Sequence, residues 1–524
     1  MCLDAWRRIK DGCPGGHMAE FDDVIVGGGS AGITLATRLT EDPARRVLLI
    51  EAGPDHPVID ADDDLADQMR FSTTLTHWGT DATFVPGMTM NYPQGRRMGG
   101  GSGVNGAFAV RGVSDDYARW AAAGGDDWAW PHVLRALCRL EDDPHGGEHH
   151  GTDGPVPIAR WTEDELLPVQ HSFRTAVTGH GIPWVEDLNA PGASGIGVMP
   201  MNRRDGNRMS TALTYLPLAR DRANLTMWTG VEVSRVLLEG GRATGVELVR
   251  DGKREEVGGE RIILCSGALQ SPTLLLRSGI GPADHLAEVG IECAVELGGV
   301  GANLRDHQGV GIFMIPRGDL PPAGDRVCQL AARYSSSSGA SVDDMWLSCW
   351  GSWELDAFPE MGAILGVPAV STFVVGVHDP LSHGTVRLRS ADPQVRPEVD
   401  FNMLSEPEDL ERLVEGLQVA IELATGPAFA DAYRGIGLLD PSAAGDRATL
   451  EGYIRSTVGG WYHAAGTCRM GADPDDGAVV DGQLQVHGVD NLHVVDASVM
   501  PTIVRAPTNL SSIAIGERAA ELLR

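Results

Sequence analysis

The chain has 524 residues, a formal net charge of −30 at pH 7 and a hydrophobic content of 42%. A chain of this length is too long to fold around one small core, so we predict two domains, or one large α/β domain with insertions. The negative charge argues against nucleic acid and anionic membranes as partners, because both would repel such a surface. No apolar run approaches the roughly 20 residues that span a membrane, so the composition predicts an acidic cytoplasmic enzyme.

Residues 1–17 contain basic residues but no apolar segment, so they do not resemble a secretory signal. They precede a second methionine, Met18, and we interpret them as a disordered extension or a misassigned start. The eight cysteines are scattered without a C-x-x-C pair. This spacing predicts reduced thiols rather than a disulfide framework.

The stretch from Asp23 to Pro54 has the pattern of a dinucleotide-binding unit. Asp23–Val26 is a β-branched run that predicts a buried strand, and the apolar spacing of Ser30–Leu39 predicts a helix. A second buried run follows at Val47–Ile50. Strand, helix and strand in this order predict a βαβ unit, which by itself fits either FAD or NAD.

Glycines at G-x-G-x-x-G spacing join the first strand to the helix. In such a turn the first glycine permits a tight bend, the second lets the backbone approach a pyrophosphate, and the third lets helix and strand touch. An acid at the end of the second strand accepts hydrogen bonds from ribose hydroxyls. The nucleotide-binding residues predicted in this unit are Gly27, Gly29, Ser30, Ala31, Gly32, Glu51 and Ala52.

A second glycine-rich stretch, Gly95–Gly112, has the sequence GRRMGGGSGVNGAFAVRG. Its glycines disfavour an ordinary helix start and suit a backbone that lies against a flat ligand. The stretch resembles the signature GRVLGGSSAINGMVYVRG of the glucose-methanol-choline oxidoreductases, which depend on FAD. Some relatives tether FAD through a histidine at the position of Val104, so the resemblance implies noncovalent FAD here. It also implies flavin contacts from Gly99, Gly101, Ser102, Asn105 and Gly106.

The segment Asp115–Leu140 is predicted to be helical, with its tryptophans in the core. Three histidines, His145, His149 and His150, follow in the loop DPHGGEHHGTDG. A metal site is one interpretation of them, but no cysteine or carboxylate spacing supports it. We therefore predict a solvated loop and no metal.

The resemblance implies that an antiparallel sheet begins at Pro155–Ile158 and that Asn202–Leu216 returns the chain toward FAD. Asn224–Val249 alternates in period two and predicts a hairpin, in which Val233 aligns with a valine that meets the adenine through its backbone. Arg261–Pro282 resembles the family's second signature, a buried strand that runs into Gly267 and an apolar helix.

The segment Gly298–His307, GGVGANLRDH, matches the family element PGVGENLQDH. The β-rich stretches Ala369–Val377 and Gly384–Leu388 are assigned to the second half of the substrate domain. Residues 308–455 look shorter than in typical relatives, which favours a trimmed lid over the substrate entrance.

The C-terminal part contains WYHAAGTCRMG at Trp461–Gly471, which matches the family's H-x-x-G-T-x-R-M-G. By this match His463 is the catalytic base. An alcohol gives up a hydride more readily as it approaches alkoxide, and a neutral imidazole can take the proton. The flavin then accepts the hydride. The later D-A-S-x-x-P-T run implies cofactor contacts from Asp496, Ala497 and Thr508.

One position departs from the family, which places a second histidine or asparagine before the last helix. A gapless alignment puts Pro507 there, and proline offers neither a side-chain donor nor a backbone N–H. Asn509 is a candidate catalytic substitute, although a flavin contact or helix cap is its preferred role. We therefore hypothesise that His463 alone is the acid/base group.

The fold class predicted is α/β, with a Rossmann-like FAD-binding domain and an α+β substrate domain built on an antiparallel sheet. The FAD-binding domain is predicted at 18–154, 220–308 and 456–524, and the substrate domain at 155–219 and 309–455. The predicted activity is FAD-dependent oxidation of a small alcohol at its CH–OH group, with oxygen or a redox partner as electron acceptor. The alternatives are a lyase or photodecarboxylase on the same fold and a catalytically impaired FAD-binding protein.

Overall fold

The computed structural model describes residues 21–55, 77–250, 252–320, 324, 326–337, 341–355 and 359–524. The predictions for residues 1–17, and for Cys2 and Cys13, lie outside these ranges. The six cysteines within them are free thiols.

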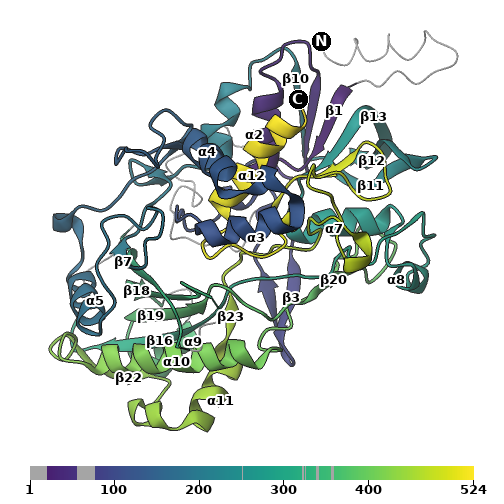
Figure 1. Ribbon diagram of the computed structural model, residues 1–524. Coiled ribbons are helices and arrows are strands. Elements are labelled where there is room, and N and C mark those ends of the chain that lie inside the picture. Colours follow the sequence, from purple (N-terminus) through teal and green to yellow (C-terminus); the bar gives the residue numbers. More distant parts are fainter. Residues whose placement is uncertain are drawn as a thin grey trace, which may run out of the picture.

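A parallel sheet fills the upper part of the molecule in Figure 1. Its strands, in spatial order, are β10 (Leu225–Thr229), β2 (Val47–Glu51), β1 (Phe21–Val26), β13 (Lys253–Leu264) and β24 (Leu492–Val494). The β-branched runs of β1 and β2 are almost entirely buried, as is typical of a parallel sheet that is covered on both faces. The sheet therefore joins N-terminal, middle and C-terminal segments of the chain.

Helices α2 (Ser30–Leu39) and α12 (Asn509–Leu522) pack against each other beside this sheet (Figure 1). A Cβ on Gly516 of α12 would lie 2.7 Å from the carbonyl oxygen of Ala31, so glycine is what lets the two backbones approach. The predicted βαβ unit is confirmed, and its helix has the predicted bounds.

The long helix predicted over 115–140 is instead two helices, α3 (Ser114–Gly124) and α4 (Trp130–Leu140). Gly125 separates them with φ of +90°, a conformation that an L-residue rarely adopts. Of the predicted core tryptophans, Trp120 and Trp128 are fully buried. Trp130 is partly buried and packs against the same core.

The hairpin predicted over 224–249 is only partly correct. β11 (Glu232–Glu239) and β12 (Arg242–Arg250) form an antiparallel meander with β13. β10 belongs instead to the parallel sheet, because Gly230, with φ of +69°, turns the chain between β10 and β11.

A large antiparallel sheet lies in the lower part of Figure 1 and confirms the sheet predicted for the substrate domain. Its order is β22 (Tyr433–Gly437), β16 (Gln308–Pro316), β19 (Ala369–Val377), β18 (Met345–Glu354), β17 (Cys328–Tyr334) and β7 (Gly195–Val198). Helix α10 (Pro407–Thr425) packs on β16 and β19 and covers this sheet from below in Figure 1.

One row of directly opposed residues crosses five strands of this sheet. In order it contains Gly309, Gly376, Trp346, Arg333 and Gly195. Directly opposed residues point to the same face of a sheet. The row therefore brings two glycines, an indole and a guanidinium onto one face.

Two strands predicted for the large sheet lie elsewhere. β6 (Val156–Pro157) pairs with β5 (Glu141–Asp142). β20 (Thr385–Arg387) belongs to a separate sheet with β21 (Glu398–Asp400), β3 (Thr80–Val85) and β4 (Met88–Tyr92). The exact domain bounds stay a prediction.

The remaining elements are shorter or peripheral. They are α5 (Pro168–Gly179), α6 (Thr211–Thr214), α7 (Gly267–Arg277), α8 (Ala283–Glu288), α9 (Pro359–Leu365), α11 (Arg447–Thr457), β8 (Arg203–Arg204), β9 (Asn207–Arg208), β14 (Ile280–Gly281), β15 (Val295–Glu296) and β23 (Gly459–Gly460).

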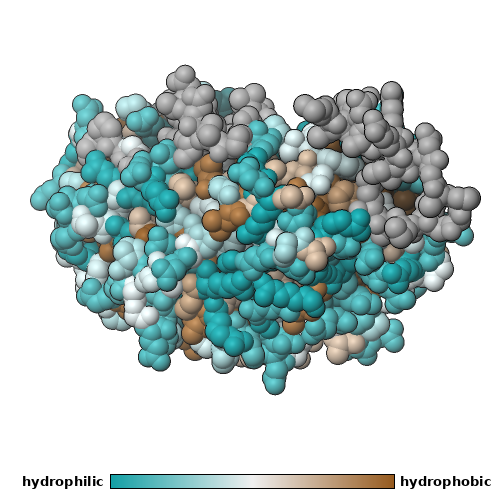
Figure 2. All heavy atoms as spheres, turned by 90° about the horizontal axis from the view of Figure 1, so that it is seen from above, coloured by the Kyte–Doolittle hydropathy of each residue, from teal (hydrophilic) through white to brown (hydrophobic). Residues whose placement is uncertain are grey.

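Hydrophilic residues predominate on the face seen in Figure 2, and hydrophobic residues appear there as small separate groups. Among the described residues, no helix combines the length and the apolar character needed to cross a membrane.

Candidate active site

The first glycine turn is shaped by close backbone contacts. A Cβ on Gly27 would lie 2.4 Å from the carbonyl oxygen of Cys265, and one on Gly32 would lie 2.0 Å from the carbonyl oxygen of Gly27. A Cβ on Gly29 would make only ordinary van der Waals contact, with Gly100 at 3.9 Å, so the middle of the turn is uncrowded. This arrangement suits a ligand phosphate at the start of α2, whose first residues are Ser30 and Ala31.

Glu51, at the end of β2, is buried and faces the glycine turn. Its carboxylate accepts hydrogen bonds from the backbone N–H of Gly28 at 2.9 Å and of Gly53 at 2.8 Å. Burial raises the pKa of Glu51 to about 7, and these hydrogen bonds oppose the shift. The acid and the neighbouring Ala52 thus border the turn where a ribose hydroxyl would be recognised.

The two glycine-rich stretches touch directly. The backbone N–H of Gly99 donates to the carbonyl of Gly28 at 2.7 Å. Ser102 Oγ donates to the carbonyl of Gly99 at 2.6 Å and accepts from the backbone N–H of Thr211 at 3.1 Å. A Cβ on Gly101 would meet no atom within 4 Å, so this loop also borders open space.

Asp496 joins the start of α7 to the C-terminal segment. Its carboxylate accepts from the N–H of Gly267 at 2.8 Å, from Ser271 Oγ at 2.5 Å and from the N–H of Ser498 at 2.8 Å. A Cβ on Gly267 would meet nothing within 4 Å, although its φ of +82° itself favours glycine. Asp496 therefore fixes the backbone at an open position.

The other predicted cofactor residues border the same region or support it. Asn105 Oδ1 accepts from the N–H of Ala107, next to Gly106, and Val233 lies buried in β11. The carbonyl of Ala497 accepts from the N–H of Gly466, and Thr508 precedes α12. Their individual cofactor contacts stay predictions.

Asn509 lies at the glycine turn. Its Oδ1 accepts from Ser30 Oγ at 2.8 Å, and its buried Nδ2 has no partner among the described residues. An unpaired buried amide is costly unless a ligand accepts its hydrogen bonds. This amide and the open positions at the glycine loops fit bound FAD. The contact with Ser30 favours a cofactor role for Asn509, and its catalytic role stays a prediction.

His463 is held by a buried carboxylate beneath its loop. Asp306 accepts from the backbone N–H groups of Trp461 (3.3 Å), Tyr462 (3.1 Å) and His463 (2.9 Å), and from the hydroxyl of Tyr92 (2.8 Å). Burial raises the pKa of Asp306 to about 7, against the lowering effect of these bonds. Asp306 thus fixes the backbone that carries the imidazole.

The ring of His463 contacts His307, the last residue of the GGVGANLRDH element. The two Nδ1 atoms are 2.8 Å apart, and His307 Nε2 lies 2.9 Å from the carbonyl of Val504. A carbonyl only accepts, so His307 carries its proton on Nε2. Burial lowers the pKa of His307 to about 4, which keeps the ring neutral. His307 Nδ1 is then the acceptor, and His463 donates from Nδ1 and keeps a free lone pair on Nε2.

Further aromatic rings pack next to the pair of His463 and His307, on the antiparallel sheet. His378 stacks on His307 with ring centroids 4.3 Å apart and on Trp346 at 4.8 Å. Trp461 lies in a slot formed by two glycines: a Cβ on Gly309 would be 2.1 Å from its Nε1, and one on Gly376 would be 2.5 Å from its Cζ2. These rings give the surroundings of His463 an aromatic wall.

The sequence did not assign a role to His307, although its motif was recognised. It lies 156 residues from His463, and the pairing of β16 with β23 and the bridge between Arg305 and Ala465 bring the two together. Pro507 is buried, as the sequence position before α12 implies, and offers no polar side chain.

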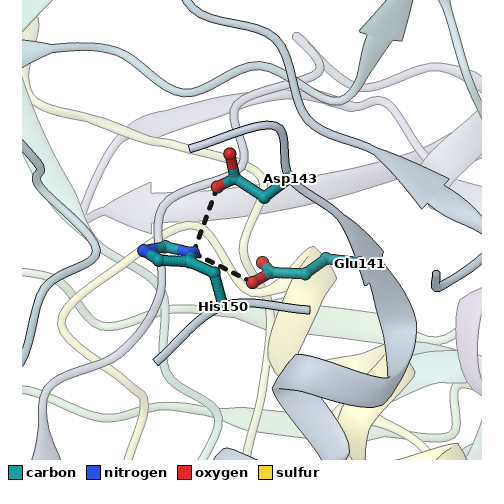
Figure 3. Close-up of side chains that lie close together, drawn as sticks. All are labelled: Glu141, Asp143 and His150. Carbon is teal, nitrogen blue, oxygen red and sulfur yellow. Dashed lines mark hydrogen bonds and ion pairs between the residues drawn. The ribbon is translucent and has the colours of Figure 1, made fainter. Parts of the chain in front are cut away.

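The loop of three histidines does not have the predicted solvated character at His150, whose side chain is only 4% exposed. His150 Nδ1 lies 3.0 Å from Glu141 and 3.1 Å from Asp143 (Figure 3). Its Nε2 lies 2.9 Å from Asp187. Arg111 and Arg160 complete the cluster through Glu141, Asp143 and Asp187. The contacts of His150 with three carboxylates keep the ring buried. The prediction of a solvated loop is therefore wrong at His150.

The same three groups, Glu141, Asp143 and His150, have the spacing of a metal site. Both nitrogens of His150 face carboxylates, however, and Asp143, Asp187 and Glu141 raise its pKa to about 11. A doubly protonated imidazolium has no lone pair for a metal. Three cations then balance three carboxylates, and we interpret the cluster as an ion-pair network.

Comparisons with known proteins agree with this geometry. The models of the N- and C-terminal parts of the GMC oxidoreductases match residues 21–309 and 380–516. A 5-(hydroxymethyl)furfural oxidase from Methylovorus sp. (strain MP688) is 36% identical over 538 residues, covering 96% of this chain and 98% of the relative. An oxygen-dependent choline dehydrogenase from Rhizobium etli is 35% identical over 539 residues, covering 96% and 95%.

A crystal structure of pyridoxine 4-oxidase from Mesorbium loti superposes with a TM-score of 0.88 at 33% identity and covers 96% of this chain and 99% of that chain. These relatives are oxidoreductases that act on alcohols, and the family models and the superposed structure match most of the chain. The chain therefore belongs to the GMC oxidoreductase family and is an FAD-dependent alcohol oxidoreductase.

Proposed function

We propose that this enzyme oxidises primary alcohols attached to planar aromatic rings, with His463 as the catalytic base. The observation that carries the proposal is the contact between His463 and His307, because it leaves His463 Nε2 unprotonated. A neutral imidazole nitrogen within reach of an alcohol hydroxyl takes its proton as the carbon–hydrogen bond weakens. When bound, FAD supplies the acceptor for the hydride that leaves the carbon.

The residues proposed to hold FAD are those of the two glycine loops, Glu51 with Ala52, Asn105 with Gly106, Val233, Gly267, the Asp496–Ala497 pair, Thr508 and Asn509. Val104 replaces the histidine through which some relatives tether the cofactor, which supports noncovalent binding. The backbone N–H groups at the start of α2 suit the pyrophosphate.

One imidazole carries the proton transfer in this proposal, because Pro507 cannot donate or accept. His307 assists because its Nδ1 accepts a hydrogen bond from the Nδ1–H of His463, which fixes the tautomer of His463. An activated alcohol suits such a site, because an adjacent aromatic ring weakens the reacting carbon–hydrogen bond. This argument favours net alcohol oxidation over the lyase, photochemical and inactive alternatives.

The substrate class is supported by the partly accessible ring of Trp461 beside His463, against which the buried rings of Trp346 and the neutral histidine His378 pack. Planar rings pack well on such surfaces. Asp306, the carboxylate nearest to the loop of His463, is occupied by four protein donors and is not free to bind a cation. Two relatives are named for hydroxymethyl groups on heteroaromatic rings. These features favour aromatic alcohols over choline.

Anaerobic mixing of the FAD-loaded enzyme with a panel of alcohols tests the proposal. Benzylic and heteroaromatic hydroxymethyl compounds are expected to bleach the oxidised flavin, whereas choline and short aliphatic alcohols do so much more slowly. Faster bleaching by choline would overturn the substrate class. Readmitting oxygen should restore the flavin colour with formation of peroxide, because we propose oxygen as the electron acceptor. A cytoplasmic location stays a prediction.

The rate of flavin reduction is expected to stay constant at neutral pH and to fall only well below pH 6.5. Burial and the neighbouring His307 lower the pKa of His463 well below its ordinary 6.5, so the base is unprotonated at neutral pH. As the pH falls through the lowered pKa, protonation removes the base. Stopped-flow reduction measured at several pH values should place the midpoint well below 6.5. A midpoint at or above 6.5 would contradict this assignment.

A further inference from the structure

Arg333, in β17, is a buried arginine without an acidic partner. It is 2% exposed, and its Nη2 donates to the carbonyl of Arg111 at 2.9 Å. Its Nε has no hydrogen-bond partner, and no carboxylate of the described residues lies within the 4.0 Å of an ion pair. Other buried arginines nearby differ in this respect: Arg111 contacts Glu141, and Arg505 contacts Asp116 at 2.7 Å.

An unpaired charge is expensive to bury, and proteins compensate it with a counter-charge. The charges that act on Arg333 through space are Asp343 and Asp116, which attract it, and Arg505, which repels it. Burial outweighs the attraction and lowers the pKa of Arg333. The surrounding protein therefore leaves much of this charge uncompensated.

Arg333 lines a pocket between three segments of the chain. Its other lining residues include Arg111, Ser114, Trp130 and Asn189. Arg111 contributes a second buried Nε without a partner. The empty space among these residues is about 230 Å³, a volume that includes open solvent at its mouth.

Helix α3 also begins at this pocket, with Val113 and Ser114 in its wall. The first N–H groups of a helix carry partial positive charge and favour anions. Asp116 accepts the backbone N–H of Val113 at 2.9 Å, and both acids of the first turn, Asp115 and Asp116, are ion-paired with Arg505. The pocket thus combines two guanidinium groups and a helix start.

We propose that this pocket binds one small monovalent anion, of the size of chloride or formate, against the guanidinium of Arg333. The anion would join β17 of the substrate-domain sheet to the segment 111–114 and to the loop 188–192. It touches no reacting group, so its expected effect is on stability rather than on the chemical step.

Thermal unfolding of the FAD-loaded enzyme tests the proposal. At constant ionic strength, replacing sodium gluconate by sodium chloride or formate is expected to raise the Tm saturably by about 2 °C or more. Arg333→Met should abolish the rise. Arg254→Met is the matched control: it makes the same substitution at an arginine whose side chain is 74% exposed and does not line the pocket. It should respond like the wild type.

A response that does not saturate, or one that persists in Arg333→Met, would attribute the rise to a general salt effect and overturn the proposal. If Arg333→Met does not fold, bromide anomalous scattering from wild-type crystals decides. A bromide peak in contact with the Arg333 guanidinium supports the site. Its absence at a bromide concentration that saturates the Tm rise contradicts it.

Discussion

Replacing His463 by alanine is expected to slow the reduction of bound FAD by an alcohol about 10²- to 10⁴-fold, the range that a positioned general base contributes. Alanine removes the Nε2 lone pair that takes the hydroxyl proton, whereas the glycine loops that hold the cofactor are unchanged. Anaerobic stopped-flow absorbance measures the rate, and the ratio of flavin to protein absorbance measures FAD retention.

His383→Ala is the matched control, because His383 is exposed and its variant should retain the wild-type rate. His307→Phe tests the tautomer argument. It keeps a ring in place but removes the acceptor for His463 Nδ1, so the rate should fall less than in His463→Ala. Undiminished reduction in His463→Ala would refute the base assignment, and an unchanged rate in His307→Phe would remove His307 from the mechanism.

Replacing His150 by leucine is expected to lower the free energy of unfolding by about 3–5 kcal/mol, the usual cost of breaking a buried ion pair from one side. The variant leaves Glu141, Asp143 and Asp187 with two arginines instead of three cations. Urea unfolding of the FAD-loaded enzyme, followed by circular dichroism, measures the loss.

His145→Leu is the matched control in the same loop, because His145 is exposed and its variant should change stability little. Equal free energies of unfolding of the two variants would show that the ion pairs of His150 do not stabilise the fold.

The His150 cluster also predicts a pH dependence with a definite sign. The pKa of His150 rises from 6.5 to about 11 on folding. The contribution of His150 to the free energy of unfolding is therefore complete below pH 6.5 and declines as the pH rises toward 11. Between about pH 6.5 and 9 the unfolding free energy of the wild type should therefore fall more steeply than that of His150→Leu. Parallel curves would contradict the protonated state of the ring.

Local signals explain why the nucleotide-binding unit could be predicted. The contact of Gly32 with the carbonyl of Gly27 lies within one short stretch, so the spacing of the glycines reveals it, whereas the contact of Gly27 with Cys265 cannot be read from that spacing. The helix Ser30–Leu39 was predicted with its observed bounds for the same reason.

Long-range contacts explain what the sequence concealed. β10 was assigned to a hairpin because its period-two pattern continues into the next strand, and only pairing with β2 decides otherwise. His150 was expected in solvent because Asp187, one of its partners, lies 37 residues away in another loop. The contact of His463 with His307 could not be predicted for the same reason, because no residue near either histidine in the sequence indicates the other.

The glycine slot of Trp461 restricts the order in which this enzyme's pocket can change. A side chain at Gly376 or Gly309 collides with the indole as long as Trp461 is present. A smaller residue at position 461 removes the collision at Gly376 and opens room beside His463, whereas a Cβ on Gly309 would still lie 2.9 Å from the carbonyl oxygen of Val375. Evolution or design that reshapes the pocket must therefore begin at position 461, because the reverse order passes through an intermediate with an overfilled sheet.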